Sequence, residues 1–262
     1  MNDKIKITQD MNGSNNIQVG QQVVNYSGLT VDDAVRIANN LFENNFPNLK
    51  EVARDTARKT AEEFFNSLSN KLKNHSHEKL DAFNQPALQY ALYQGIKNFV
   101  RYPDQQKQDL ITDIIVERVL QNDSEVSLKV AIDKAIETAA LLNQDQLDYL
   151  TLVFLVKNLK VSFGNVKELN DYFKAIANVF ANVSNISFHY LNYLGCFELH
   201  LGSASSIVKS NYPQFDAASI KVPEIFNVVP GDYGVSYMGR VLCLTNVRKK
   251  LNLNVRLEKI LK

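Results

Sequence analysis

Residues 144–158, QDQLDYLTLVFLVKN, form the most uniformly apolar helical pattern in the chain. From Tyr149 to Val156 only Thr151 interrupts the aliphatic and aromatic run, so the predicted helix has no polar face and belongs at the centre of the protein. A membrane span needs about 20 apolar residues, and this run is much shorter. The stretch therefore predicts a buried central helix that begins directly after Asn143.

Helical patterns also occupy most of the chain on either side. Thr30 and Asp33 form a capping-box pattern that opens a helix to about residue 46, and Pro47 then begins another helix to about residue 74. Further helices are predicted at about 86–101, 104–121, 125–142, 166–181, 185–200 and 236–251, with residues 202–234 as loop and short elements. The fold class is mainly α, and the polar break at 74–84 divides a two-helix stalk or oligomerisation region (29–74) from a helical domain (85–262).

The predicted helix 47–74 carries one apolar stripe along its whole length. It consists of Leu49, Ala53, Ala57, Ala61, Phe64, Leu68 and Leu72. Small alanines in the first half favour close packing of two helices. The stripe is typical of an ordinary core helix, or of a stalk that joins protomers. In the second interpretation Ala53, Ala57, Ala61 and Phe64 supply the seam between copies.

The first 28 residues differ from all that follow, because they are rich in Asn, Gln, Gly and Ser with alternating apolar residues. A three-residue turn, Met11-Asn12-Gly13, would place Ile7 opposite Ile17 in a β-hairpin and Ile5 opposite Val19. Two strands alone are marginally stable in water. We therefore expect this segment, 1–28, to dock on the body or to pair with other copies of the chain.

Charge and motifs favour no catalytic or nucleic-acid function. Twenty-nine basic residues against 28 acidic ones give a net charge of +1 and no bulk attraction for nucleic acid. A basic run at Arg248-Lys249-Lys250, extended by Arg256, Lys259 and Lys262, could attract phosphates, but it is better explained as basic residues that complement the dipole at a helix C-terminus. The sequence has no Walker pattern, no Gly-x-Gly-x-x-Gly loop and no Gly-x-Ser-x-Gly elbow. No cofactor is predicted.

Neither the histidines nor the cysteines form a recognisable site. His75 and His77 lie in the polar break without further ligands, and His189 and His200 are three turns apart on the predicted helix 185–200. His200 follows Cys196 by one turn of that helix, a spacing more typical of core packing than of catalysis.

Cys196 and Cys243 sit in apolar surroundings and are expected to be buried thiols in a reducing compartment. Because the N-terminus lacks an apolar signal region, a cytoplasmic location is expected.

The tetrad Ile17-Gln18-Val19-Gly20 resembles the Ile/Val-Gln-Ile/Val-Gly core of RHIM-type amyloid signalling motifs. Alternating β-branched residues can form a dry zipper face, while Gln and Asn amides form ladders along a stack. Alternatively, the segment is a hairpin that caps the helical body, or a small β-element built by several protomers.

A broader resemblance covers residues 7 to about 159. The matching features are the leader QDMNGSNNIQ (9–18), Gly28-Leu29-Thr30 before VRIA (35–38), LFENNF (41–46), ARKTAEEF (57–64) and QDQLD (144–148), with a looser match at 239–246. In these features the chain resembles a family of bacterial proteins that carry locus tags and no defined activity. Similar leaders occur on bacterial immune proteins, so the resemblance implies an antiphage role and supplies no catalytic residues.

These observations lead to one expected function and two alternatives. The first is a non-enzymatic, self-assembling sensor, scaffold or effector in bacterial antiphage or stress defence, with a homo-oligomer and a phage or host protein as trigger. The second is an enzyme with an unrecognised hydrolytic site in residues 185–245. The third is an effector that exposes the apolar helices 149–156 or 186–201 and contacts a membrane only when activated.

Overall fold

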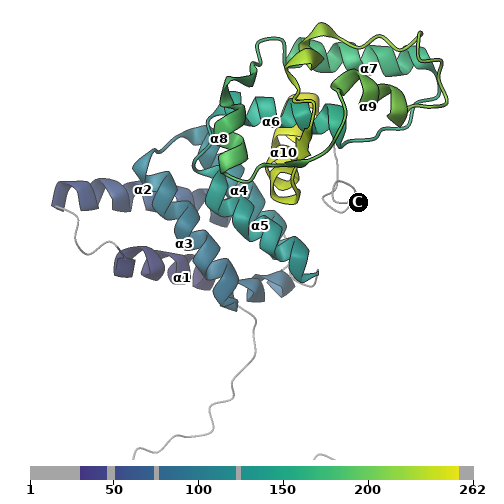
Figure 1. Ribbon diagram of the computed structural model, residues 1–262. Coiled ribbons are helices and arrows are strands. Elements are labelled where there is room, and N and C mark those ends of the chain that lie inside the picture. Colours follow the sequence, from purple (N-terminus) through teal and green to yellow (C-terminus); the bar gives the residue numbers. More distant parts are fainter. Residues whose placement is uncertain (1–29, 46–50, 74–76, 122–124, 254–262) are drawn as a thin grey trace, which may run out of the picture.

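The computed structural model describes residues 30–45, 51–73, 77–121 and 125–253, and within them the protein is mainly helical, as predicted (Figure 1). The α-helices are α1 (Val31–Asn45), α2 (Glu51–Leu72), α3 (Pro86–Arg101), α4 (Gln105–Leu120), α5 (Val126–Ala139), α6 (Gln144–Lys157), α7 (Val166–Val179), α8 (Phe188–Tyr193), α9 (Ala204–Asn211) and α10 (Tyr237–Leu251). Short 3-10 helices are η1 (His77–Asn84), η2 (Asn185–Ser187) and η3 (Glu224–Val228), and the strands are β1 (Phe197–Leu199) and β2 (Tyr233–Val235). The predicted N-terminal β-segment, with Ile17, Gln18, Val19 and Gly20, lies outside the described residues, as does His75.

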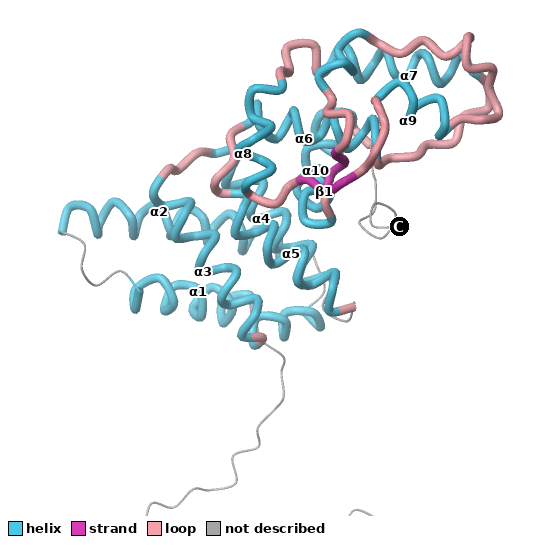
Figure 2. The backbone as a smooth tube through the Cα atoms, in the orientation of Figure 1, coloured by secondary structure: helices cyan, strands magenta, loops and turns pink. Residues whose placement is uncertain are grey.

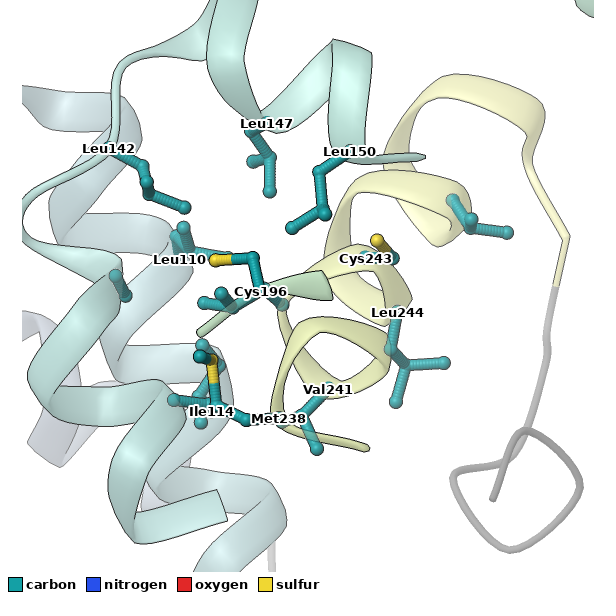
Figure 3. Close-up of a cluster of buried hydrophobic side chains, with 14 of the residues drawn as sticks. Leu110, Ile114, Leu142, Leu147, Leu150, Cys196, Met238, Val241, Cys243 and Leu244 are labelled. Carbon is teal, nitrogen blue, oxygen red and sulfur yellow. The ribbon is translucent and has the colours of Figure 1, made fainter. Parts of the chain in front are cut away.

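Helix α6 occupies the centre, as its apolar sequence predicts. Every side chain from Leu147 to Lys157 is buried, and α6 packs against α10, β2 and α9. In Figure 1, α1, α2 and α3 lie at one end of the molecule and α7 and α9 at the other, with α6 and α10 between them. Figure 3 shows Leu110 and Ile114 of α4, Leu147 and Leu150 of α6, and Val241 and Leu244 of α10 as members of one cluster of buried apolar side chains.

Side-chain caps fix where several helices begin. Thr30 and Asp33 form the predicted capping box, since each backbone N–H is bonded by the other side chain, at 3.1 and 3.2 Å. Asn143 and Gln146 form a second capping box at the start of α6. Each box satisfies backbone N–H groups that have no partner within their helix. The start of the central helix is therefore defined by its own local sequence.

The apolar stripe of α2 packs mainly within its own chain. Ala57, Ala61 and Phe64 are buried, whereas Ala53 is exposed. The Phe64 ring lies 5.4 Å from the ring of Phe99 on α3, measured between centroids, and α2 also packs against α1 and α4. These three side chains therefore pack in the core of the single chain, as those of an ordinary core helix do.

The predicted helix 185–200 is wrong in its second half. Helix α8 ends at Tyr193, Gly195 adopts a positive φ of 79°, and the chain continues as strand β1. β1 pairs antiparallel with β2, with Phe197 opposite Val235 and Leu199 opposite Tyr233. Figure 2 shows this strand pair in magenta beside α10. Consequently Cys196 and His200 are not one helical turn apart, and His189 lies on α8 whereas His200 directly follows β1.

Replacing Gly239 by alanine is expected to lower the free energy of unfolding by about 1–3 kcal/mol, the usual cost of overpacking. A Cβ atom at this position would lie 2.5 Å from the Cys196 carbonyl oxygen and 2.6 Å from Cγ1 of Val235. This clash outweighs the better helix propensity of alanine, about 1 kcal/mol. Urea denaturation followed by circular dichroism measures the change.

Gly231→Ala is the matched control, because a Cβ there meets nothing within 4 Å. We expect this variant to stay within about 0.5 kcal/mol of the wild type. An equal loss in both glycine variants would contradict the close approach of α10 to Cys196.

Candidate functional site

An open cavity of about 710 Å³ lies between α4 and α10 and is here called the α4–α10 groove. Helix α2 contributes Lys71 to its edge, and the first turn of α6 contributes Gln144 and Leu147. A volume of this size lies within the range of binding sites for ligands or peptide side chains. The groove is therefore the strongest candidate site in the described part of the chain.

One face of α4 supplies both the floor and an acidic edge. Its apolar residues Leu110, Val116 and Leu120 line the groove together with Leu147 of α6. Asp109, Asp113 and Glu117 also line it and follow one another at four-residue spacing, so they share one side of the helix. Asp104 fixes the start of α4 by accepting hydrogen bonds from two backbone N–H groups.

Ion pairs join this acidic edge to two other helices. Lys71 Nζ of α2 lies 2.5 Å from Asp113 Oδ1, and the Arg248 guanidinium of α10 lies 2.5 Å from Glu117 Oε1. Partly exposed ion pairs add little stability. Their consequence is geometric, since they connect α2 and α10 to α4 at the groove and place charges of both signs at its edge.

Behind the groove, a polar network connects α6 to α10. The nearly buried carboxylate of Asp148 accepts hydrogen bonds from Gln144 Nε2 at 2.6 Å and from Asn246 Nδ2 at 2.9 Å, and it pairs with Lys250. Asn246, only 2% exposed, also donates to Thr151 Oγ1 at 2.9 Å. The network thus fixes the orientation of α10 relative to α6.

The thiols of the protein are buried and poorly suited to nucleophilic catalysis. Both cysteines are free, as predicted. Burial raises the pKa of Cys196 to about 12 and that of Cys243 well above its ordinary value, so both stay protonated near neutral pH. The thiolate is the nucleophilic form. Among residues 30–45, 51–73, 77–121 and 125–253, no cluster of three His, Cys, Asp or Glu side chains could hold a metal ion.

A buried lysine, Lys157, stands at the end of α6. Its Nζ donates to the carbonyl oxygens of Gly231 at 2.6 Å, Gly202 at 2.9 Å and His200 at 3.4 Å. Desolvation lowers the pKa of Lys157 to about 8, while the charge of Asp232 acts in the opposite direction. All three donors of the ammonium group are engaged, so this lysine holds the loops around β1 and β2 together.

The groove was not predicted from sequence, although two of its components had local signals. The Asp109-Asp113-Glu117 spacing marks one edge of α4, and the basic run Arg248-Lys249-Lys250 was assigned to the end of a helix. Two of these three cations are paired, Arg248 with Glu117 and Lys250 with Asp148. Of the predicted oligomerisation residues, Ala57, Ala61 and Phe64 lie in the core and do not line the groove.

Comparisons with known proteins give one result. A family model whose description reads only ":-like" matches residues 28–260. Neither the curated proteins nor the solved structures contain a significant match. None of the described helices combines the length and apolar character that crossing a membrane requires.

Proposed function

The chain belongs to the family described as ":-like", and because that description names no activity, we propose a function from sequence and geometry together. The protein is a non-enzymatic, self-assembling sensor or scaffold of bacterial defence. In this proposal the α4–α10 groove binds a polypeptide segment of a phage or host trigger, and the N-terminal segment joins copies of the chain.

The composition of the groove is the observation that supports binding rather than catalysis. Its floor is apolar, and its edge carries Lys71, Arg248 and Lys249 against Asp109, Asp113 and Glu117. An amphipathic polypeptide presents an apolar stripe flanked by charges of both signs, which matches this surface. Exposed Lys249 and partly buried Asp109 lie outside the two ion pairs that close the edge. Asp109 Oδ1 accepts a hydrogen bond from the neutral amide of Gln105 at 3.2 Å, and in this proposal its charge and that of Lys249 meet charged groups of a partner.

A plaque assay tests the defence role and the groove together. Bacteria that express the wild type are challenged with a panel of phages and compared with bacteria that express Asp109→Lys/Lys249→Glu. We expect protection from the wild type and its loss in the groove variant, because both edge charges are reversed. Lys209→Glu is the matched control, since Lys209 is exposed on α9, outside the groove.

Each result of that assay bears on the proposal. Protection retained by the folded groove variant would contradict recognition in the groove, and absence of protection by the wild type would contradict the defence role.

Self-assembly is tested separately by light scattering of the full chain. The wild type is expected to be larger than a monomer and Ile17→Asp/Val19→Asp to be monomeric, whereas equal mass for both would overturn assembly through the N-terminal segment.

A further inference from the structure

We propose that the outer edge of β1 is the docking site for residues 17–19 of a second copy of this chain. The inference rests on the proposed self-assembly and names the surface that would receive the N-terminal segment. It starts from the two-stranded sheet, whose two outer edges differ in how their backbone groups are satisfied.

The pairing of β1 with β2 fixes which backbone groups point outward. Ser236 N–H donates to the Cys196 carbonyl at 2.9 Å, and His200 N–H donates to the Asp232 carbonyl at 2.8 Å. Antiparallel strands alternate between residues that face the partner strand and residues that face away. Since positions 196, 198 and 200 face β2, the backbone groups of Phe197 and Leu199 point to the other side. Phe197 is only 7% exposed, so the accessible part of this edge is Leu199 together with Leu201, which follows the last paired residue, His200.

Among the described residues, side chains hydrogen-bond to the backbone of the β2 edge but not to that of the β1 edge. At the edge of β2, the Val235 N–H donates to Asn158 Oδ1 at 2.9 Å, and its carbonyl accepts from Arg240 Nε at 3.0 Å. At the edge of β1, no group of the described residues hydrogen-bonds to the backbone of Leu199 or Leu201. An unpaired strand edge is a template for another strand.

The side chains at this edge add an apolar surface. Leu199 and Leu201 are each 71% exposed. They alternate with Glu198 and His200, which lie on the opposite face: Glu198 Oε1 pairs with Arg240 at 2.6 Å, and the His200 ring lies where a Cβ of Gly234 would be. The edge therefore offers two leucines on one face and polar side chains on the other.

Residues 17–19 have the alternation that this edge requires. Ile17 and Val19 would lie beside the two leucines, and Gln18 beside the polar face. Residues 11–29 contain no charged residue, so pairing along this segment buries no charge. Residues 20–29 can span about 35 Å when extended, which lets the segment reach beyond its own first helix to a neighbouring copy.

Light scattering of full-length variants tests this docking site. We expect Leu199→Asp/Leu201→Asp to lose assembly as completely as Ile17→Asp/Val19→Asp does, because a carboxylate at the edge opposes apolar pairing. Val130→Asp is the control, since Val130 is a 60% exposed apolar residue on α5. If the β1 variant keeps the wild-type mass while the Ile17→Asp/Val19→Asp variant becomes monomeric, the docking site is wrong and self-assembly stands. If neither variant changes the mass, both proposals fail.

Disulfide cross-linking distinguishes a second copy from the same chain. A chain with Leu199→Cys or Leu201→Cys is mixed with a chain carrying Ile17→Cys or Val19→Cys and mildly oxidised. Cross-strand neighbours lie within disulfide distance, so covalent heterodimers are expected, and Lys209→Cys should give none. Equal cross-linking at Lys209→Cys would overturn the inference. So would disulfides that form only within one chain when it carries both cysteines.

Discussion

Replacing Arg118 by methionine is expected to lower the free energy of unfolding by about 3–5 kcal/mol, because it leaves a buried charge without its partner. Arg118 is 1% exposed, and its Nε donates to Asp133 Oδ1 at 2.7 Å. Its Nη2 donates to Gln85 Oε1 at 3.0 Å, so one side chain joins α4, α5 and the residue before α3. Urea denaturation at neutral pH measures the loss.

The loss should depend on pH through Asp133. Burial raises the pKa of Asp133, and the Arg118 charge opposes that rise. Without Arg118 the pKa rises further, so folded Asp133 binds a proton at a pH where unfolded Asp133 has already lost it. Stability of the variant then falls as pH increases through this range. The difference in unfolding free energy between the wild type and Arg118→Met is therefore expected to be smaller at pH 5 than at pH 7.

The double variant Arg118→Met/Asp133→Leu provides the decisive comparison. It removes both charges, and replacing a buried ion pair by apolar residues is often nearly neutral. Arg118 Nη1 is buried and has no hydrogen-bond partner in the described structure. Removing this unsatisfied donor is a further reason to expect the double variant to recover stability. A double variant no more stable than Arg118→Met, or a single-variant loss below about 1 kcal/mol, would show that the pair is not the source of the effect.

The helices were predictable because their signals are local. Asn143 and Gln146 lie within one turn, as do Thr30 and Asp33, and both pairs form the caps that their spacing indicates. The uninterrupted apolar run of α6 also predicts its central place, since a helix without a polar face must be surrounded by protein. In these segments, neighbouring residues alone determine the structure.

Strand β1 was missed because its pairing partner lies far along the chain. Leu199 pairs with Tyr233, and the segment between them contains α9 and η3. The local pattern nevertheless contained a warning, since Phe197-Glu198-Leu199-His200-Leu201 alternates with a period of two. Gly195 before it, at a positive φ, ends the helical geometry.

The groove could not be predicted from one sequence, because it forms only when α2, α4 and α10 come together. Arg248 and Glu117 are 131 residues apart in the chain, and Lys250 and Asp148 are 102 apart. Nothing local to the basic run of α10 indicates those acidic partners. The charge pattern of a single helix predicts which of its sides is polar, but it does not predict which other helix lies beside that side.

Replacement of Lys157 by methionine is expected to cost about 2–4 kcal/mol of unfolding free energy, since three carbonyl groups lose their donor. The Lys157 side chain is 2% exposed, and its ammonium group ties Gly231 to Gly202 and His200. Methionine matches the apolar stem and supplies no N–H. Lys160→Met is the control, because Lys160 is exposed nearby, and it should change stability by less than about 0.5 kcal/mol.

The stability contributed by Lys157 should rise with pH above neutrality. Its folded pKa of about 8 lies below the ordinary value of 10.5. Between those values the unfolded chain holds the proton more tightly than the folded one, so increasing pH favours the folded state. The free energy of unfolding of the wild type and of Lys157→Met is measured by denaturation at pH 7.5 and pH 10. Because both proteins contain the same cysteines and tyrosines, the effect of titrating those groups cancels in the difference between the two proteins. The wild type is expected to exceed Lys157→Met in stability by a larger margin at pH 10 than at pH 7.5. A margin that shrinks over this interval would contradict the prediction, because it would mean that the three carbonyl partners favour the ammonium form despite its burial.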